Sequence, residues 1–125
     1  MLASLRVVLS DDEAPLVRAL GRLFRRQGVE TIDDLEGAVV SIAEQSPPDL
    51  ILLDLHQGTS GLELLRELKA NPRTQEVSVV MMSGDDSPRE RAAALAAGAD
   101  GFLLKPFDLA EVEGLILKLR KARGE

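Results

Sequence analysis

Three aspartates follow two short apolar runs, and their spacing suggests chemistry at one edge of a sheet. Asp11 and Asp12 follow residues 5–10, and Asp54 follows residues 50–53. A carboxylate is costly to bury, so an acid at the end of a buried strand needs a physical reason. If the two runs are neighbouring parallel strands, the carboxylates meet where open α/β sheets bind ligands. Three like charges this close would repel, which points to a hard, oxygen-binding cation such as Mg²⁺.

The elements that would position these acids follow from the hydrophobic pattern. Short apolar runs indicate strands, and apolar residues at helical spacing, bounded by Pro and Gly, indicate helices. We expect strands at residues 6–10, 29–32, 50–53, 77–82 and 101–104. Helical spacing is found over residues 16–24, 38–43, 62–68 and 109–119, and an alanine-rich helix is expected from 88 to 97.

This alternation predicts a doubly wound α/β domain. Its five-stranded parallel sheet would carry five helices on its two faces, joined by right-handed crossovers. The mostly apolar first, third and fourth strands should be central. We find no linker, repeat or low-complexity segment, so we expect residues 1–125 to form a single domain.

Composition and charge exclude several classes of function. The 125 residues are 45% hydrophobic and 29% charged, which fits one globular domain with a real core. The chain has no cysteine, which excludes disulfides, thiolate zinc sites and a cysteine nucleophile. A net charge of −6 and 2% aromatic residues argue against direct nucleic-acid binding. Without a membrane-spanning stretch or a signal peptide, the protein is expected to be cytoplasmic and away from the membrane.

Four segments together resemble the receiver domain of two-component response regulators. They are VVLSDDE at 7–13, ILLDL at 51–55, VVMMSG at 79–84 and GFLLKPFD at 101–108. Each is weak alone, but their order and spacing resemble the family over nearly the whole chain. The resemblance implies a flavodoxin-like sheet with strand order 2-1-3-4-5.

The resemblance also implies a role for each polar residue. Asp54 would be the phosphoryl acceptor, a carboxylate nucleophile that forms an aspartyl phosphate. Mg²⁺ would be held directly by Asp12 and Asp54, through water by Asp11, and by the backbone carbonyl of His56. Lys105 would reach a phosphoryl oxygen as a point positive charge.

A conformational switch is implied as well. Ser83 would donate its hydroxyl to the phosphoryl group and draw the following loop inward. Phe102 would then turn from an exposed to a buried position, by packing alone because it lacks a hydroxyl. The bond Lys105–Pro106 is the family's usual place for a cis peptide. The face formed by the alanine-rich helix, the fifth strand and the last helix would change shape for a downstream protein effector or a homodimer.

The loop after Asp54 departs from the family pattern. The family usually takes eight steps from the acceptor to a glycine, with a proline between, whereas Asp54 to Gly61 takes seven and has none. We therefore expect a looser or differently turned loop. His56 and Asp85 stand where the family tunes the lifetime of the phosphoryl group. Our hypothesis is that they bias the attacking water and give an unusual dephosphorylation rate.

Simpler interpretations exist for single residues. Asp12 and Glu13 suit the first turn of any helix, where acids are favourable. By itself, Lys105 is an ordinary solvated lysine and Phe102 an ordinary core residue. The matching Asp54 and the register of the whole set favour the functional interpretation.

Three function classes remain open from the sequence. The first is a signalling switch, not an enzyme, that takes its phosphoryl group from a histidine kinase or phosphotransfer protein. The second is a phosphatase of the haloacid dehalogenase type, which also uses a strand-end aspartate with Mg²⁺ but wants an acid at the position of His56. The third is a degenerate receiver that acts as a docking scaffold, which would have lost Asp54 or Lys105.

Overall fold

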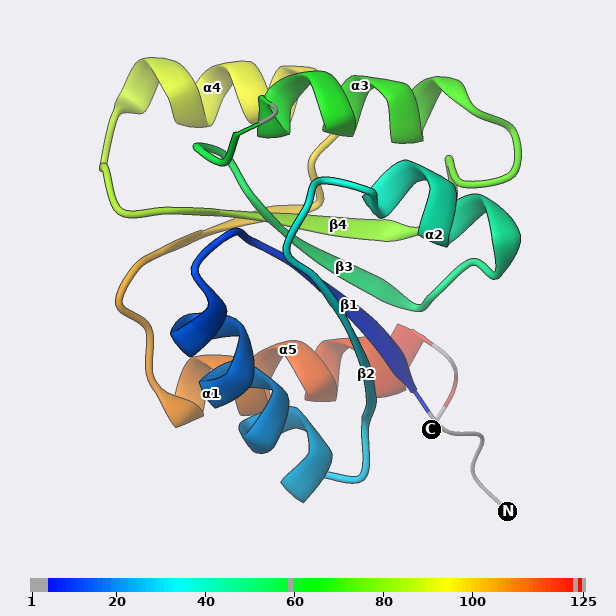
Figure 1. Ribbon diagram of the computed structural model, residues 1–125, viewed down its shortest axis with the longest axis vertical. Helices are drawn as coiled ribbons and strands as arrows, with labels where there is room; N and C mark the ends of the chain where they lie inside the picture. The colour runs from blue at the N-terminus through cyan, green and yellow to red at the C-terminus, as the bar shows by residue number, and fades with distance from the viewer. Residues whose placement is uncertain (1–4, 59, 123, 125) are drawn as a thin grey trace.

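A five-stranded parallel sheet forms the middle layer of the molecule (Figure 1). The computed structural model describes residues 5–58, 60–122 and 124. The strands are β1 (Arg6–Ser10), β2 (Glu30–Asp34), β3 (Leu50–Asp54), β4 (Ser78–Ser83) and β5 (Gly101–Leu104). Their order across the sheet is β2-β1-β3-β4-β5, which confirms the predicted doubly wound topology.

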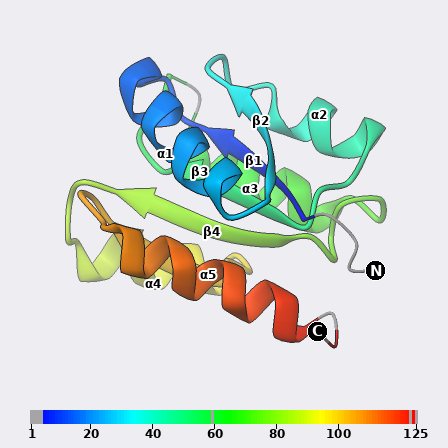
Figure 2. The same cartoon turned by 90° about the horizontal axis from the view of Figure 1, so that it is seen from below.

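Helices cover both faces of the sheet. They are α1 (Ala14–Arg26), α2 (Val39–Gln45), α3 (Gly61–Ala70), α4 (Pro88–Ala96) and α5 (Leu109–Ala122). Helices α1 and α5 lie on one face, and α2, α3 and α4 lie on the other (Figures 1 and 2). Within the described residues, no helix is long and apolar enough to cross a membrane.

Successive residues of the central strands feed two separate apolar layers, because side chains alternate across a strand. The layer under α1 and α5 takes Val7, Leu9, Leu50 and Leu52. The layer under α2, α3 and α4 takes Val8, Ile51 and Leu53. Each of these side chains is almost fully buried, and burial of one stabilises the fold by about 1.5–3 kcal/mol. The central strands are thus apolar on both faces, as a sheet covered on both sides requires.

The edge strand β2 is polar, and its bounds differ from the prediction. The expected range was 29–32, but the ladder with β1 continues from Glu30 to Asp34. Polar side chains are tolerated in β2 because only one of its edges is paired and its residues are mostly half-exposed. The apolar pattern alone therefore placed this strand too early.

The strand register brings the carboxyl ends together at one edge of the sheet. The last residues pair across neighbouring strands: Ser10 with Asp34 and Leu53, Asp54 with Met82, and Ser83 with Leu104. Polar side chains that end or follow these strands are therefore neighbours in space.

Candidate functional site

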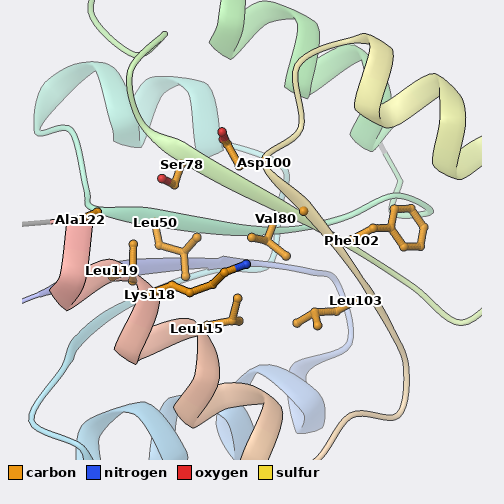
Figure 3. A pocket seen from close by; sticks show the side chains of 11 residues that line it. Leu50, Ser78, Val80, Asp100, Phe102, Leu103, Leu115, Lys118, Leu119 and Ala122 are labelled. Carbon is orange, nitrogen blue, oxygen red and sulfur yellow. The ribbon is translucent and has the colours of Figure 1, made fainter.

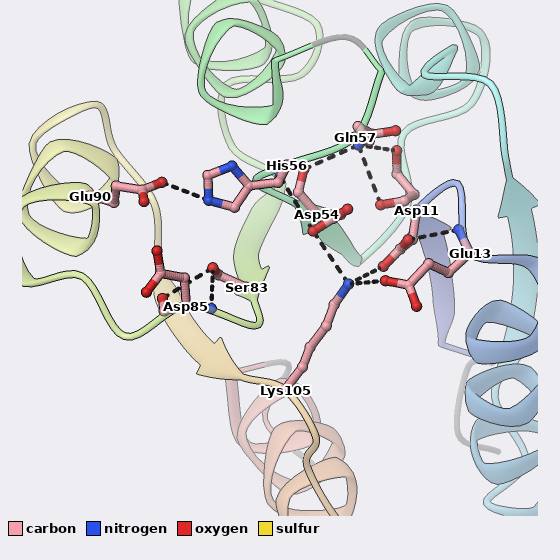
Figure 4. Close-up of polar contacts among 10 residues, drawn as sticks. Asp11, Glu13, Asp54, His56, Gln57, Ser83, Asp85, Glu90 and Lys105 are labelled. Carbon is pink, nitrogen blue, oxygen red and sulfur yellow. Dashed lines mark hydrogen bonds and ion pairs between the residues drawn. The ribbon is translucent and has the colours of Figure 1, made fainter.

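Lys105 connects two acids that the sequence places far apart. Its Nζ lies 2.6 Å from Asp11 Oδ2 and 3.3 Å from Asp54 Oδ1, with Glu13 Oε1 also at 3.3 Å (Figure 4). The lysine follows β5, whereas the two aspartates lie at the ends of β1 and β3. We call Asp11, Asp12, Asp54 and Lys105 the acceptor cluster.

Burial sets the electrostatics of the acceptor cluster. Asp11 is fully buried, and Asp54 is only 4% exposed. Burial raises the pKa of Asp54, the charge of Asp11 raises it further, and Lys105 offsets part of the rise. Burial by itself would lower the pKa of Lys105, but the hydrogen bond that it donates to Asp11 and the charges of Asp11 and Asp54 raise the pKa overall. Lys105 therefore stays cationic at neutral pH.

Three of these residues form a group that could hold a metal ion. Asp11, Asp12 and Asp54 each offer an oxygen, and these oxygens lie within 4.8 Å of one another. Asp12 is exposed, which gives an ion a path from solvent. Carboxylate oxygens are the ligands of hard divalent cations, and the ammonium of Lys105 balances only one of the three charges. The donor set thus fits such a cation.

The described part of the loop after β3 is firmly held, contrary to the looser loop expected from its length. Gln57 is 9% exposed, and its Nε2 donates to the Asp54 carbonyl oxygen at 3.2 Å. A Cβ on Gly61 would collide with the backbone of Asp54 and Leu55, so α3 begins directly against the end of β3. The buried Gln57 amide and the close packing of Gly61 therefore anchor the described residues of this loop.

The imidazole of His56 makes a contact that the sequence did not suggest. Its Nε2 lies 2.7 Å from Glu90 Oε2 of α4, and its backbone N–H donates to Asp54 Oδ1 at 3.4 Å (Figure 4). The sequence suggested a metal-binding carbonyl and a role in phosphoryl lifetime for His56, but no partner for its imidazole. No sequence signal pairs His56 with Glu90, because the contact arises from the packing of α4 beside the loop.

Ser83 lies at the same sheet edge, but it is turned away from Asp54 (Figure 4). Its Oγ accepts from the Asp85 N–H at 3.0 Å and donates to the Asp85 carbonyl at 3.1 Å. In the part of the chain that the structure describes, these are its side-chain hydrogen bonds. The serine is therefore occupied by its own loop.

Phe102 occupies an intermediate position. Its ring is half-buried against the layer under α4, and the Arg91 guanidinium carbon lies 5.1 Å from the ring centroid. Arg91 also pairs with Asp86 at 3.0 Å. The structure thus places Phe102 neither fully out nor fully in. The peptide bond Lys105–Pro106 is cis.

A separate cavity of about 330 Å³ lies at the opposite edge of the sheet (Figure 3). Residues near the beginnings of β3, β4 and β5 line it, including Leu50, Ser78 and Gly101, together with Leu115 and Leu119 of α5. Because parallel strands point the same way, this cavity is remote from the acceptor cluster. It therefore has no part in chemistry at the carboxylates.

Comparison with known proteins decides the family. A profile of the response regulator receiver domain matches residues 7–117. The chain belongs to the response regulator receiver family. This receiver domain acts in phosphorylation-dependent two-component signalling, and the resemblance drawn from its sequence segments is confirmed.

Two transcriptional regulators illustrate the sequence relationship. The receiver domain is 34% identical over 125 residues to the transcriptional regulatory protein PrrA of Mycobacterium tuberculosis, which covers 98% of this chain and 53% of PrrA. It is 32% identical over 110 residues to the phosphate regulon transcriptional regulatory protein PhoB of Escherichia coli, covering 86% of this chain and 48% of PhoB. The chain thus spans about half the length of these relatives.

Solved structures show the same fold. The chemotaxis protein CheY4 of Vibrio cholerae aligns with a TM-score of 0.87 at 20% identity and covers 94% of this chain and 99% of its own. A response regulator of Burkholderia pseudomallei, with a phosphorylated aspartic acid, calcium ion and citrate, aligns with a TM-score of 0.80 at 23% identity. That match covers 87% of this chain and 64% of the other. The flavodoxin-like architecture is therefore shared.

Proposed function

We propose that this receiver domain accepts a phosphoryl group on Asp54 in the presence of Mg²⁺. The observation that carries the proposal is the position of Lys105, whose ammonium lies between the buried carboxylates of Asp11 and Asp54. A lysine and three metal-competent acids, one of which is the strand-end nucleophile, are the parts that phosphoryl transfer to a carboxylate needs. Residues 1–125 are proposed to form one receiver domain.

Mg²⁺ would reduce the repulsion between the carboxylate and the incoming phosphoryl group. Asp12 and Asp54 would bind it directly, Asp11 through water, and His56 through its backbone carbonyl. Mg²⁺ usually keeps several waters, so few protein ligands are needed. Support comes from the spacing of the three carboxylates and from the exposure of Asp12.

In the transfer itself, an Asp54 carboxylate oxygen attacks the phosphorus, and the bond from phosphorus to the donor breaks. With a phosphohistidine donor, the electrons of that bond stay on the imidazole nitrogen. Lys105 would exchange its contact with Asp54 for a phosphoryl oxygen, and the backbone N–H of His56 offers another donor at the same carboxylate. The protein thus supplies position and charge, as phosphoryl transfer requires.

We propose a histidine kinase or phosphotransfer protein as the phosphodonor, in the cytoplasm. Helix α1 starts two residues after Asp12 and carries four exposed arginines and no acidic residue. This basic helix stands out in a chain of net charge −6 and suits an acidic surface on the donor. Transfer from the protein donor should then slow with added salt, whereas transfer from acetyl phosphate should not.

The output is proposed to pass through α4, β5 and α5. Ser83 would leave Asp85 for the phosphoryl group, and Phe102 would move with the loop. Exposed Leu95, Leu104 and Leu109 give this side of the molecule apolar area for a downstream protein effector or a second copy of the chain. His56 and Asp85 would tune the lifetime of the phosphoryl group.

Incubation with acetyl phosphate and Mg²⁺, followed by intact mass measurement, tests the proposal. We expect one phosphoryl adduct, lost in Asp54→Asn and kept in the matched control Asp33→Asn, which changes an exposed acid of β2. Multiple turnover of a small phosphate ester would instead favour a phosphatase. Absence of an adduct would favour a docking scaffold.

The lifetime proposal has its own measurement. The phosphorylated His56→Asn variant should lose its phosphoryl group at a different rate from the unchanged protein, because both the side chain above the loop and its contact with Glu90 change. Equal decay rates would remove His56 from this role.

A further inference from the structure

Gln57 ties together the ends of three strands. Its Nε2 donates to the Asp54 carbonyl oxygen at 3.2 Å (Figure 4). It also donates to the Ser10 carbonyl at 3.4 Å and to Ser10 Oγ at 3.3 Å. Ser10 Oγ in turn donates to Asp34 Oδ2 at 2.8 Å. We call Gln57, Ser10 and Asp34 the amide bridge. It connects β1, β2 and the loop after β3.

The amide bridge is buried, so its hydrogen bonds matter. Ser10 is fully buried, Asp34 is 3% exposed and Gln57 is 9% exposed. A buried amide or carboxylate without partners is costly. Among the described residues, no buried side-chain nitrogen or oxygen lacks a partner. The other carboxylate oxygen of Asp34, Oδ1, accepts hydrogen bonds from the backbone N–H groups of Glu36 and Ala38.

The geometry gives the bridge a consequence for the acceptor cluster. The hydrogen bond from Gln57 to the Asp54 carbonyl closes the segment from 54 to 57 on itself. The peptide that carries the His56 carbonyl lies inside this closed segment. Its orientation is therefore limited by where the Gln57 amide is held, and Ser10 holds that amide against the end of β1.

We propose that Gln57 is a positioning residue for metal binding and phosphoryl transfer at Asp54. Its side chain replaces the restraint that the shortened loop lacks, and it keeps the His56 carbonyl and the Asp54 backbone in place. This inference rests on the proposed function. In this role Gln57 does not contact the phosphoryl group but acts through the backbone of its neighbours.

The first measurement is the Mg²⁺ affinity of Gln57→Met by calorimetry, since methionine keeps the length of the side chain and removes the amide. We expect about tenfold weaker binding, the usual scale for losing a group that orients a metal ligand. The backbone amides of residues 55–58 should also exchange with solvent faster in the metal-free variant. Wild-type affinity with unchanged exchange would overturn the inference.

Thr74→Val is the matched control. Thr74 is fully buried, and its Oγ1 donates to the Leu68 carbonyl at 2.6 Å, in the segment before β4 and away from the acceptor cluster. It should lose stability as Gln57→Met does, but keep its Mg²⁺ affinity. If both variants lost affinity equally, Gln57 would have only a structural role.

Ser10→Ala provides a second test through the same bridge. Combined with Gln57→Met, it should weaken Mg²⁺ binding no more than the stronger single change, because both remove one restraint. Additive losses would contradict a shared bridge. Failure of the unchanged protein to bind Mg²⁺ or to form an adduct would overturn the proposed function instead, so the two failures are distinguishable.

Discussion

The acceptor cluster and the opposite part of the same sheet edge are built in contrasting ways. Within the acceptor cluster, Asp11 and Asp54 are buried and share the ammonium of Lys105. Around the end of β4, the residues expected to respond to phosphorylation make contacts within one loop or contacts between partly exposed side chains. We call this second group the switch side: Ser83, Asp85, Glu90, Arg91 and Phe102.

The contrast matches the proposed division between groups that do chemistry and groups that move. Buried ion pairs hold their geometry, because losing one partner leaves a charge without compensation. Exposed pairs such as Arg91 with Asp86 contribute roughly 0–1 kcal/mol each. The switch side should therefore rearrange at lower cost, and a new hydrogen bond at Ser83 is proposed to shift its population.

The largest expected effect comes from Lys105→Met. It leaves Asp11 and Asp54 without the ammonium between them, and we expect the free energy of unfolding at pH 7 to fall by about 3–5 kcal/mol. Arg91→Met, the matched change on the switch side, should cost less than about 1 kcal/mol. Urea unfolding followed by circular dichroism measures both. Equal losses would mean that the two regions are not built differently.

Asp54→Asn should stabilise the protein at neutral pH. The pKa of Asp54 is raised above its ordinary 3.8 by burial and by Asp11, so the folded state binds its proton more tightly than the unfolded chain does. The stabilisation of the fold by protonated Asp54 is complete at pH values below the unfolded pKa. It is lost as the pH rises through the folded pKa. Ionised Asp54 is therefore a net cost at pH 7, and asparagine removes it.

We expect the melting temperature of Asp54→Asn to rise by a few degrees at pH 7, about 1 kcal/mol for a domain of this size. The gain should shrink as pH falls toward 4, where the carboxyl takes up its proton. Scanning calorimetry at both pH values measures it. A gain that is the same at both would show that the charge is not its source.

Ser83→Ala tests the switch side directly. We expect a loss of about 1 kcal/mol or less, because the backbone groups of exposed Asp85 can bond water in place of the hydroxyl. The phosphoryl adduct should still form, but the accompanying change in amide exchange of α4 should weaken. Ser78→Ala, at the other end of β4, should leave that exchange response intact. A full response in Ser83→Ala would rule out the serine as the link.

The smallest effect is expected for Glu90→Gln. Both Glu90 and His56 are partly exposed, so loss of their contact should change the free energy of unfolding by less than about 1 kcal/mol. Because the contact joins the loop after β3 to α4, amide exchange at the start of α4 should nevertheless rise. Unchanged exchange would show that the two regions meet there without coupling.

The sheet and the acceptor cluster could be predicted from sequence because they follow from strong, local patterns. Buried central strands such as β3 are continuous apolar runs, and the strand order carries their end residues to one edge. The proximity of Asp11 and Asp54 then needs no side-chain detail. The polar edge strand β2 was displaced, because its residues lack that apolar signal.

The contacts that join separate elements could not be predicted in this way. His56 meets Glu90 only because α4 packs beside the loop, and neither residue has a pattern that names the other. In the sequence, Gln57 resembles any polar loop residue. Only the structure shows that its amide bonds to the buried hydroxyl of Ser10. Glu13, interpreted as a first-turn acid, also reaches Lys105.

The amide bridge predicts that its residues coevolve among receiver domains. Ser10, Asp34 and Gln57 depend on one another for hydrogen bonds, and Gly61 fixes where the following helix begins. A mutation at one of the three positions would leave a neighbour with an unsatisfied hydrogen-bonding group, so substitutions at these positions should be correlated. Receivers that share the seven-step spacing should carry a polar residue at all three places, and those with the eight-step loop should be free to lose them.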